Sequence, residues 1–471
     1  MSITDELEPI FRPRSIAVIG ASHVPGKWGN RMLTNAYRSG FPGPTYPVNP
    51  NEQTISGLKA YPSVLDIPGD VDLAVFTVPS AQVPQAMREC VQKGVRAGVV
   101  ISAGFAEANE EGRRLQDECN EIARAAGFRF VGPNCMGIFS AAGRLNLSFD
   151  VGRGGVNPGH IAFISQSGTL GNYLALLASA KGYGLSKFVS TGNQANISFA
   201  EYLEYLYDDP DTRAVILYVE GLTEARRFVE VAKQVVRRKP VLVYKAGRTA
   251  AGARASLSHT ASLAGADEIF DAMCRQVGII REFEVMHPFD MAEALARQPL
   301  PRGNRVTVIS GGGGQCVTAA DACASMGLDL PEFDIETQGR IRQFLAPHAP
   351  APRNPIDLAA TPVGIGSIAE IVAEVPYIDG ILVQQPFAGP GRRMTADLGR
   401  MLIEGAERIA AIPEKYGKPV ITTSMMRFGA PISMDILAAA GIPAYETPED
   451  TARAMAGLAK YAAIRRSLEE E

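Results

Sequence analysis

The chain of 471 residues is predicted to be an α/β protein with parallel sheets in three domains. Short apolar runs rich in β-branched residues alternate with longer amphipathic segments, which is the pattern of strands joined by helical crossovers. Two Gly- and Pro-rich stretches, 150–160 and 295–305, interrupt this alternation. Because so long a chain does not form one core, we expect domains at 1–150, 151–297 and 298–471, close to the common size of about 150 residues.

The predicted strands are short and mostly apolar, and they lie at 15–20, 73–78, 97–102, 160–165, 214–219, 240–245, 305–310, 380–385 and 419–424. Amphipathic spacing predicts helices at 83–94, 111–127 and 224–239, and a capped helix with a charged end at 448–471. Segments 159–182 and 304–327 resemble each other. Each is a strand ending in Ile-Ser, then a small-residue loop, then a helix that ends near Gly, so related architectures are expected in the second and third domains.

Composition excludes several classes of protein. The net charge of −4 disfavours broad nucleic-acid binding, which needs a concentrated basic surface. Six scattered cysteines form no CxxC pair and no zinc-type spacing, so no metal site is expected and the thiols are interpreted as reduced. No apolar run approaches the roughly 18 residues of a membrane span, and the N-terminal stretch is acidic rather than signal-like. We therefore expect a cytoplasmic protein with no membrane or nucleic-acid partner.

The first predicted strand leads into "GASHVPGKWGN", a Gly-rich turn before a helix, which suits a nucleotide phosphate. Its glycines do not have GxGxxG spacing, and the second strand region carries Asn49 and Asn51 where an NAD site usually has an acid. An adenine-containing ligand other than NAD is therefore favoured, and Lys27 favours additional phosphates. The alternative is a loop that merely turns the chain.

Three later segments of the first domain, "TVPSAQV", "ISAGFAE" and "GPNCMG", follow or flank strands and contain Gly, Pro or Ser. Loops at strand ends of an open α/β sheet line one crevice, so three such loops predict a long ligand. Cys135 in the last of them could be a nucleophile, but small buried cysteines are common and the structural interpretation is favoured.

Two loops have the composition of anion sites. In "FISQSGTLG" the hydroxyls and N–H groups of 165–169 would lie at a helix start. The same stretch lacks the leading Gly of a GxSxG nucleophile elbow. Gly311–Gly314 forms a second such loop, and four glycines in succession predict close approach of the backbone to another group, with a plain packing loop as the alternative.

Glu220 directly follows a predicted strand, at the edge where such folds hold their sites, although it could be a solvated loop acid. His259 lies among small residues in "ARASLSHTASLAGADEIF". By itself, a lone loop histidine is more often a surface or packing residue.

Taken together and in order, "SIAVIGAS", "PGKWGN", "PVNPN", "ISAGFAE", "GPNCMGI", "ISQSGTLG", "YVEG", "KAGR" and "SHTASLAG" resemble the α subunit of NDP-forming acyl-CoA synthetases. This superfamily includes succinyl-CoA synthetase and the ADP-forming acetyl-CoA synthetases. The resemblance covers essentially the whole chain, and "GGGGQCVTAADA" and "APRNPIDL" are closer to the acetate enzymes. It implies an N-terminal CoA-binding Rossmann-like domain followed by two flavodoxin-like ligase domains, the first of which bears the phosphohistidine.

The resemblance also implies roles for individual residues. His259 matches the histidine that is phosphorylated, and Glu220 matches the acid that orients it. Phosphate-binding positions would be Ser165, Gln166, Ser167, Gly168, Thr169, Gly312, Gly313 and Gly314. CoA-binding positions would be Ser22, Lys27, Asn49, Pro79, Ser102, Gly104 and Asn134.

The implied reaction converts a carboxylic acid, CoA and ATP to acyl-CoA, ADP and phosphate through acyl phosphate and phosphohistidine. No ATP-grasp region is recognisable, so ATP/ADP and Mg²⁺ would be bound by a separate ATP-grasp β subunit in an α2β2-like hetero-oligomer. The sequence departs from the family pattern at Ala261, Asn196 and Ser198. Two other hypotheses remain: a non-catalytic CoA-binding sensor or scaffold subunit, and an NAD-linked oxidoreductase, which the missing ribose-binding acid disfavours.

Overall fold

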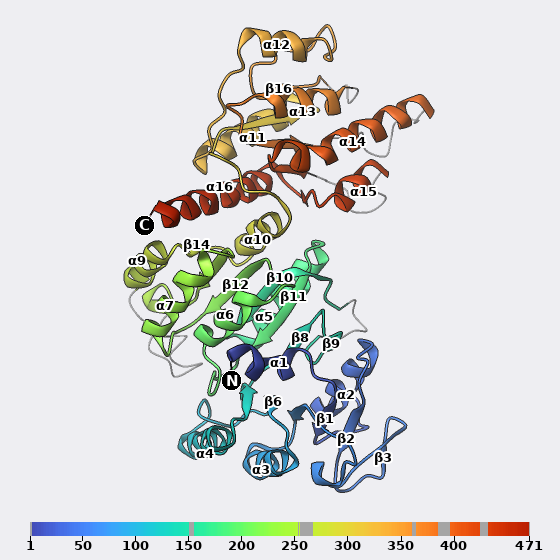
Figure 1. The fold of residues 1–471 in the computed structure, drawn as a ribbon, viewed down its shortest axis with the longest axis vertical. Helices are drawn as coiled ribbons and strands as arrows, with labels where there is room; N and C mark the ends of the chain where they lie inside the picture. The colour runs from blue at the N-terminus through green and yellow to red at the C-terminus, as the bar shows by residue number, and fades with distance from the viewer. Residues whose placement is uncertain are drawn as a thin grey trace. The chain divides into compact units, whose positions relative to one another are not determined.

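The computed structural model describes residues 2–149, 155–252, 254, 267–359, 364–384, 396–423 and 432–470. The chain divides into two compact units, Met1–Pro288 and Phe289–Glu471. The first unit contains two large sheets and the second unit contains one (Figure 1). The predicted boundary at residue 150 falls after 138–146, whose two short strands already belong to the second sheet of the first unit, and the three domain boundaries stay predictions.

The first sheet is parallel and has the strand order β2(Thr45–Val48), β1(Ile16–Ile19), β5(Leu73–Phe76), β6(Ala97–Val100), β7(Arg129–Val131). Every residue of β1, β5 and β6 is buried, which explains their continuous apolar runs. The crossovers include α2(Trp28–Arg38), α3(Val83–Lys93) and α4(Glu110–Ala126), with 3-10 turns η1(Val64–Asp66) and η2(Ser80–Gln82). A small ribbon, β3(Thr54–Ile55) with β4(Leu58–Lys59), follows β2.

The second sheet has the order β14(Ile280–Glu282), β13(Val241–Lys245), β12(Ala214–Val219), β10(Pro158–Ser165), β11(Leu185–Ser190), β8(Ile138–Ser140), β9(Leu145–Asn146). Its helices are α5(Gly168–Ala180), α6(Phe199–Asp208), α7(Ala225–Val236) and α9(Asp267–Val277), and α1(Ile3–Phe11) packs on α6. β8 and β9 run antiparallel to their neighbours, unlike the wholly parallel sheets predicted. The chain leaving the first sheet joins the second as the hairpin of β8 and β9, with β9 at the edge, and antiparallel pairing needs no helical crossover.

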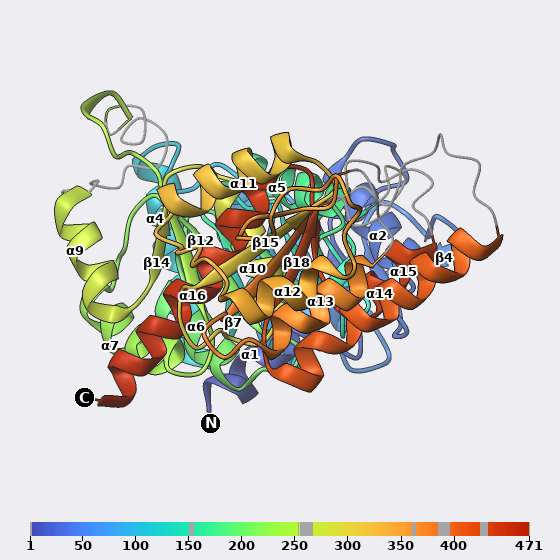
Figure 2. The ribbon, with the colours of Figure 1, turned by 90° about the horizontal axis from the view of Figure 1, so that it is seen from above.

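The third sheet is parallel, with the order β16(Ile356–Asp357), β15(Val306–Ser310), β17(Gly380–Gln384), β18(Val420–Thr423), β19(Ala444–Tyr445). In Figure 2, α11(Gly313–Ser325) runs along one side of β15 and β18, with α13(Ile365–Glu374) and α14(Ala396–Tyr416) along the other. The remaining helices are α10(His287–Arg297), α12(Ile335–Arg342), α15(Ile432–Ala439) and the predicted terminal helix α16(Pro448–Glu470). Among the helices of the described ranges, none has the length and apolar character that a bilayer crossing needs.

All three sheets share one topology, because in each the parallel strands are ordered second, first, third, fourth, fifth. The first and third strands are therefore neighbours whose following loops diverge, which opens a crevice at their carboxyl ends. The repeat predicted between 159–182 and 304–327 extends to side-chain contacts. Ser165 Oγ donates to the carbonyl of Ser167 at 2.8 Å, and Ser310 Oγ donates to the carbonyl of Gly312 at 3.2 Å.

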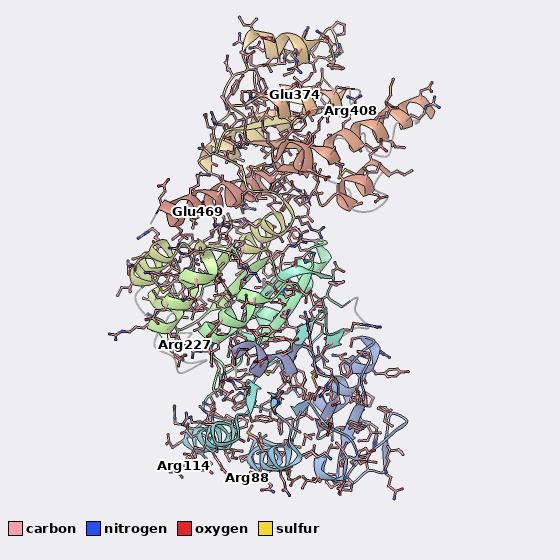
Figure 3. The ribbon with its side chains drawn as sticks, viewed as in Figure 1. Arg88, Arg114, Arg227, Glu374, Arg408 and Glu469 are labelled. Carbon is pink, nitrogen blue, oxygen red and sulfur yellow. The ribbon has the colours of Figure 1, made fainter. Side chains whose placement is uncertain are left out.

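Helices on the same face are also joined by ion pairs at the surface, and Figure 3 labels one member of several of them. Arg88 of α3 pairs with Glu118 of α4, and Arg408 of α14 pairs with Glu370 of α13 at 3.2 Å. Such exposed pairs each contribute only about 0–1 kcal/mol. The buried apolar clusters, rather than these pairs, hold the layers together.

Helices α13 and α14 cross at two glycines, which makes a testable prediction about stability. A Cβ added to Gly366 would lie 2.6 Å from the Cα of Gly405, so Gly366→Ala must push the helices apart. We expect the free energy of unfolding to fall by about 1–3 kcal/mol, measured by denaturant titration. The matched control is Gly399→Ala in α14, where an added Cβ meets nothing within 4 Å and helix propensity should raise stability by up to about 1 kcal/mol. Equal effects of the two changes would contradict this account of the crossing.

Candidate functional site

The loop after β1 brings a helix start to the carboxyl edge of the first sheet. Gly20 has φ +86°, and a Cβ added to Gly29 would lie 2.1 Å from the carbonyl oxygen of Gly20. The first turn of α2 can therefore pack directly on the strand end, as helix starts do in nucleotide-binding α/β folds. Its free N–H groups and the positive end of the helix dipole lie at this edge, where an anionic group would be favoured.

Three of the predicted CoA positions, Ser22, Lys27 and Asn49, lie in the loops after β1 and β2, and of these only Asn49 lines the hollow found there. Asn49 donates from Nδ2 to the carbonyl of Ala21 at 2.8 Å and accepts the N–H of Asn51, so its side chain holds the loop after β1. Ser22 Oγ accepts the N–H of Val24 at 3.1 Å, and Lys27 is exposed at the N-cap position of α2. A hollow of about 570 Å³ lies here, lined in part by Gly20, Asn49, Asn51 and Val78.

The other CoA positions lie on neighbouring strand-end loops that are bonded to one another. Ser102 Oγ donates to the carbonyl of Val78, and the carbonyl of Ser102 accepts the N–H of Asn134 at 2.9 Å. Gly104 has φ +98° and donates its N–H to Glu107 at 2.7 Å. Pro79 precedes the turn η2 on the loop after β5.

A second cleft, of about 650 Å³, is the main candidate site because it combines predicted residues of two kinds. Ser102 and Asn134 lie in loops that follow strands of the first sheet, and α5 follows a strand of the second sheet. The predicted residues that line the cleft are Ser102, Asn134, Gln166, Ser167, Gly168 and Thr169. Gly221, which follows Glu220, lines it as well. The cleft therefore brings CoA candidates next to the predicted phosphate loop.

The residues of this loop do not all face a ligand. Ser165 is fully buried and its hydroxyl is bonded to the carbonyl of Ser167, so it shapes the loop from beneath. Ser167 is the N-cap of α5, and its hydroxyl makes no capping bond. A Cβ added to Gly168 would lie 2.7 Å from Cγ of Met136, so a larger residue here would require the Met136 side chain to move. The open N–H groups at the start of α5 are the part of the cleft where an anion would be favoured.

Gln166 holds the segment that carries Glu220. Its Oε1 accepts the N–H groups of Glu220 and Gly221, and its Nε2 donates to the carbonyl of Gly221 at 3.0 Å. On the other side, Lys245 Nζ donates to the carbonyl of Glu220 at 2.8 Å. Glu220 is only 7% exposed, and burial together with this neighbouring acid raises the pKa of Tyr218. Glu220 is thus a rigidly held, buried acid rather than a solvated one.

His259 and Ala261 lie outside the described residues, so the pairing of His259 with Glu220 stays a prediction. In the second unit, Gly312 is the N-cap of α11, which places Gly311–Gly314 at a helix start as predicted. A Cβ on Gly313 would approach Asp357 at 3.1 Å, whereas at Gly312 and Gly314 it would meet nothing within 4 Å. Internal packing therefore restricts only Gly313, and the open space at the other two leaves room for a ligand.

Among the lining residues of the second cleft that sequence reasoning did not single out, four are of particular interest: Trp28, Met136, Asn193 and Gln194. Asn193 donates to both Glu107 and Gln116, and bonds from Asn193, Gly104 and Phe105 outweigh burial and lower the pKa of Glu107. The last two of the four follow β11, a strand that was not predicted, so no strand-end loop was expected there. Trp28 is the single tryptophan of the chain, which makes it a convenient reporter.

Two departures from the family pattern have structural roles. Asn196 accepts the N–H of Phe130 at 3.1 Å, and Ser198 caps α6 in a reciprocal arrangement with Glu201. Asn196 lines a separate hollow of about 590 Å³ rather than the cleft beside α5. Within the described ranges, no group of three His, Cys, Asp or Glu residues is arranged to hold a metal.

Family models match the two parts of the chain that contribute residues to the second cleft. A family model described as "CoA binding domain" matches residues 14–141, and one described as "Succinyl-CoA ligase like flavodoxin domain" matches residues 158–295. The chain is thus an α/β protein with an N-terminal CoA-binding domain and a flavodoxin-like ligase domain, as predicted.

Relatives of nearly the same length define the family more closely. The α subunit of acetate–CoA ligase (ADP-forming) II of Pyrococcus furiosus is 41% identical, over 97% of this chain and 98% of its own length. The α subunit of the type I enzyme of that organism is 39% identical, over 97% of each chain. A solved structure of Ca. Korarchaeum cryptofilum dinucleotide-forming acetyl-coenzyme A synthetase 1, in complex with phosphate and ADP, has a TM-score of 0.86 at 36% identity and covers 98% of both chains. The chain belongs to the family of ADP-forming acetate–CoA ligase α subunits, which confirms the resemblance.

Cys135 lines the second cleft, and its reactivity can be predicted. It is 4% exposed, its thiol donates to the carbonyl of Val100, and burial raises its pKa to about 12. At pH 8 only about one thiol in 10⁴ would be ionised, so iodoacetamide should not label Cys135 in the native chain, as measured by peptide mass spectrometry. Unfolding in denaturant is the positive control. Fast native labelling, or loss of turnover in Cys135→Ser, would favour a nucleophile.

Proposed function

We propose that this chain joins an ATP-grasp β subunit to convert a carboxylic acid, CoA and ATP into acyl-CoA, ADP and phosphate, and the reverse. The observation that carries the proposal is the second cleft, which combines Ser102 and Asn134 with the start of α5. A thioester and a phosphate bound there would lie side by side. The relative solved in complex with phosphate and ADP is named an acetyl-coenzyme A synthetase, which supports the proposal.

In the direction of acid formation, a phosphate oxygen attacks the thioester carbonyl, and CoA leaves as its thiolate, which takes up a proton. The resulting acyl phosphate then loses its phosphoryl group to a ring nitrogen of His259, and the carboxylate leaves. The open N–H groups of α5 would stabilise the phosphoryl oxygens in both steps, because they are fixed in place before reaction.

Glu220 would accept a hydrogen bond from the second ring nitrogen of His259, which fixes the tautomer and aims the attacking nitrogen. The bonds from Glu220 and Gly221 to Gln166, and from Lys245 to the carbonyl of Glu220, support this role because they hold the acid's backbone from two sides. We place Gly312, Gly313 and Gly314 at a second phosphate-binding helix start.

The phosphorylated loop would then deliver its phosphoryl group to ADP on the β subunit, where Mg²⁺ would offset the phosphate charge. The names of two relatives as an α subunit support the β partner. The acids in relatives' names vary: a 4-hydroxybutyrate–CoA ligase of Nitrosopumilus maritimus is 32% identical, and a trans-feruloyl-CoA synthase is 30% identical. We therefore assign the chain to carboxylic acids as a class.

The proposal is tested by following phosphate onto the chain. With the β subunit, Mg²⁺ and radiolabelled ATP, the wild-type chain should gain acid-labile, base-stable phosphate, and His259→Ala should gain none. Glu220→Gln should slow labelling by about 10²–10⁴-fold, because it loses the charge that orients the imidazole. Glu230→Gln, at an exposed acid of α7, is the matched control.

Equal labelling of wild type and His259→Ala would show that His259 is not the phosphorylated residue. CoA binding in calorimetry without labelling or turnover for any acid would instead indicate a sensor or scaffold subunit. Tight NADH binding, measured by fluorescence, would support the oxidoreductase hypothesis.

A further inference from the structure

Gln194 is a buried residue in a strained conformation at the wall of the second cleft. It is 9% exposed and lines the same cleft as Ser167 and Gly168. Its φ of +54° lies in the left-handed region, which a glutamine seldom adopts. Its N–H donates to the carbonyl of Thr191 at 3.1 Å, so the strained turn is held by its own backbone. Strain of this kind at the edge of a cleft suggests a functional constraint on the side chain.

A chain of hydrogen bonds determines which end of the Gln194 amide is the oxygen. The backbone N–H groups of Glu220 and Gly221 can only donate, so the Gln166 atom that they contact must be its oxygen. The Nε2 of Gln166 therefore donates, and it lies 3.2 Å from Oε1 of Gln194. The other end of the Gln194 amide must then be the NH₂ group. This assignment follows from the network itself rather than from a choice between two equivalent amide orientations.

That NH₂ group is a donor without an acceptor. Nε2 of Gln194 is buried and has no hydrogen-bond partner among the residues that the structure describes. A buried amide donor left unpaired is destabilising, and folded proteins seldom retain one without a ligand, ion or water to accept its proton. A glutamine at this position thus combines backbone strain with an unused donor, and a bound acceptor would account for both.

We propose that Gln194 is an oxyanion-binding residue of this cleft, whose Nε2 donates to an oxygen of the phosphate or carboxylate bound at the start of α5. The inference deepens the proposed function and rests on it for the identity of the anion. The neighbouring N–H groups at Ser167 and Gly168 favour negative charge, while Gln194 adds a directed donor from the side. The bond between Gln166 and Gln194 also connects this donor to the backbone of Glu220, so the acid and the oxyanion donor are positioned by one side chain.

The test measures anion binding by the full-length chain through the fluorescence of Trp28, with ³¹P line broadening as a second measure for phosphate. Inorganic phosphate and acetate are titrated separately against wild type, Gln194→Met and Gln194→Glu. Methionine keeps the length of the side chain but has no donor, and glutamate adds a charge that opposes an anion. We expect at least tenfold weaker binding of the anion that Gln194 contacts, with the larger loss in Gln194→Glu. CoA affinity and the thermal midpoint should stay close to wild type.

Two further variants separate this role from a structural one. Gln194→Asn keeps an amide and tolerates the left-handed backbone, so it should bind the anion more tightly than Gln194→Met. Gln343→Glu makes the same charge change at an exposed residue and should bind like wild type. Loss confined to phosphate assigns the donor to the phosphoryl group, and loss confined to acetate assigns it to the carboxylate.

Unchanged affinity for both anions in Gln194→Met, or a fall in CoA affinity and thermal midpoint equal to the fall in anion affinity, would overturn the proposal. Failure of the proposed function is distinguishable. The wild-type chain could gain no histidine phosphate while its phosphate affinity still depends on Gln194. That result would support Gln194 as an anion donor and contradict the phosphohistidine mechanism.

Discussion

The close backbone contact between segments 132–137 and 190–194 is the constraint on which the site depends. A Cβ on Gly192 would lie 2.2 Å from the carbonyl oxygen of Pro133, so only glycine fits there. Backbone bonds run from Asn193 to Pro133, from Ala195 to Gly132 and from Ser190 to Gly137. The chain then continues as β8, paired antiparallel with β11. Because the segment that leaves the first sheet pairs with the second sheet, residues predicted to bind CoA and residues predicted to bind phosphate line one cleft.

The contact between segments 132–137 and 190–194 also explains why polar side chains are found in the interior beside it. Loops that end parallel strands leave N–H and carbonyl groups without ladder partners, and side-chain amides and hydroxyls satisfy them. Asn49, Ser102 and Gln166 each bond to the backbone of a neighbouring loop. Several residues predicted to bind a ligand thus also fix the shape of neighbouring loops, and their binding roles stay predictions. Hydrogen-bond donors on loops fixed in this way stabilise developing charge without reorganising.

A buried ion pair stabilises the second sheet, and it shows a limit of predicting strands from sequence patterns. Lys187 in β11 is fully buried, and its Nζ lies 2.6 Å from Oδ2 of Asp209. This cation holds the Asp209 carboxyl in its charged form and lowers its pKa despite burial. The charge interrupts the apolar run "LSKFVS", so the strand was not predicted, although every residue of it is buried. Removing one partner alone would leave an unpaired buried charge, which typically costs about 3–5 kcal/mol.

The sequence by itself determined the fold class, the longer strands, the helix-start loops and the family, because continuous apolar runs and Gly-rich turns are local signals. It also located Glu220 at a strand end and 165–169 at a helix start. Only the tertiary structure decided which of these residues share a cleft, because that depends on strand order and on the contact at Gly192. It likewise revealed Trp28, Met136 and Gln194 as cleft residues. The orientation of an amide such as Gln194 is set by partners distant in sequence, and no local pattern encodes it.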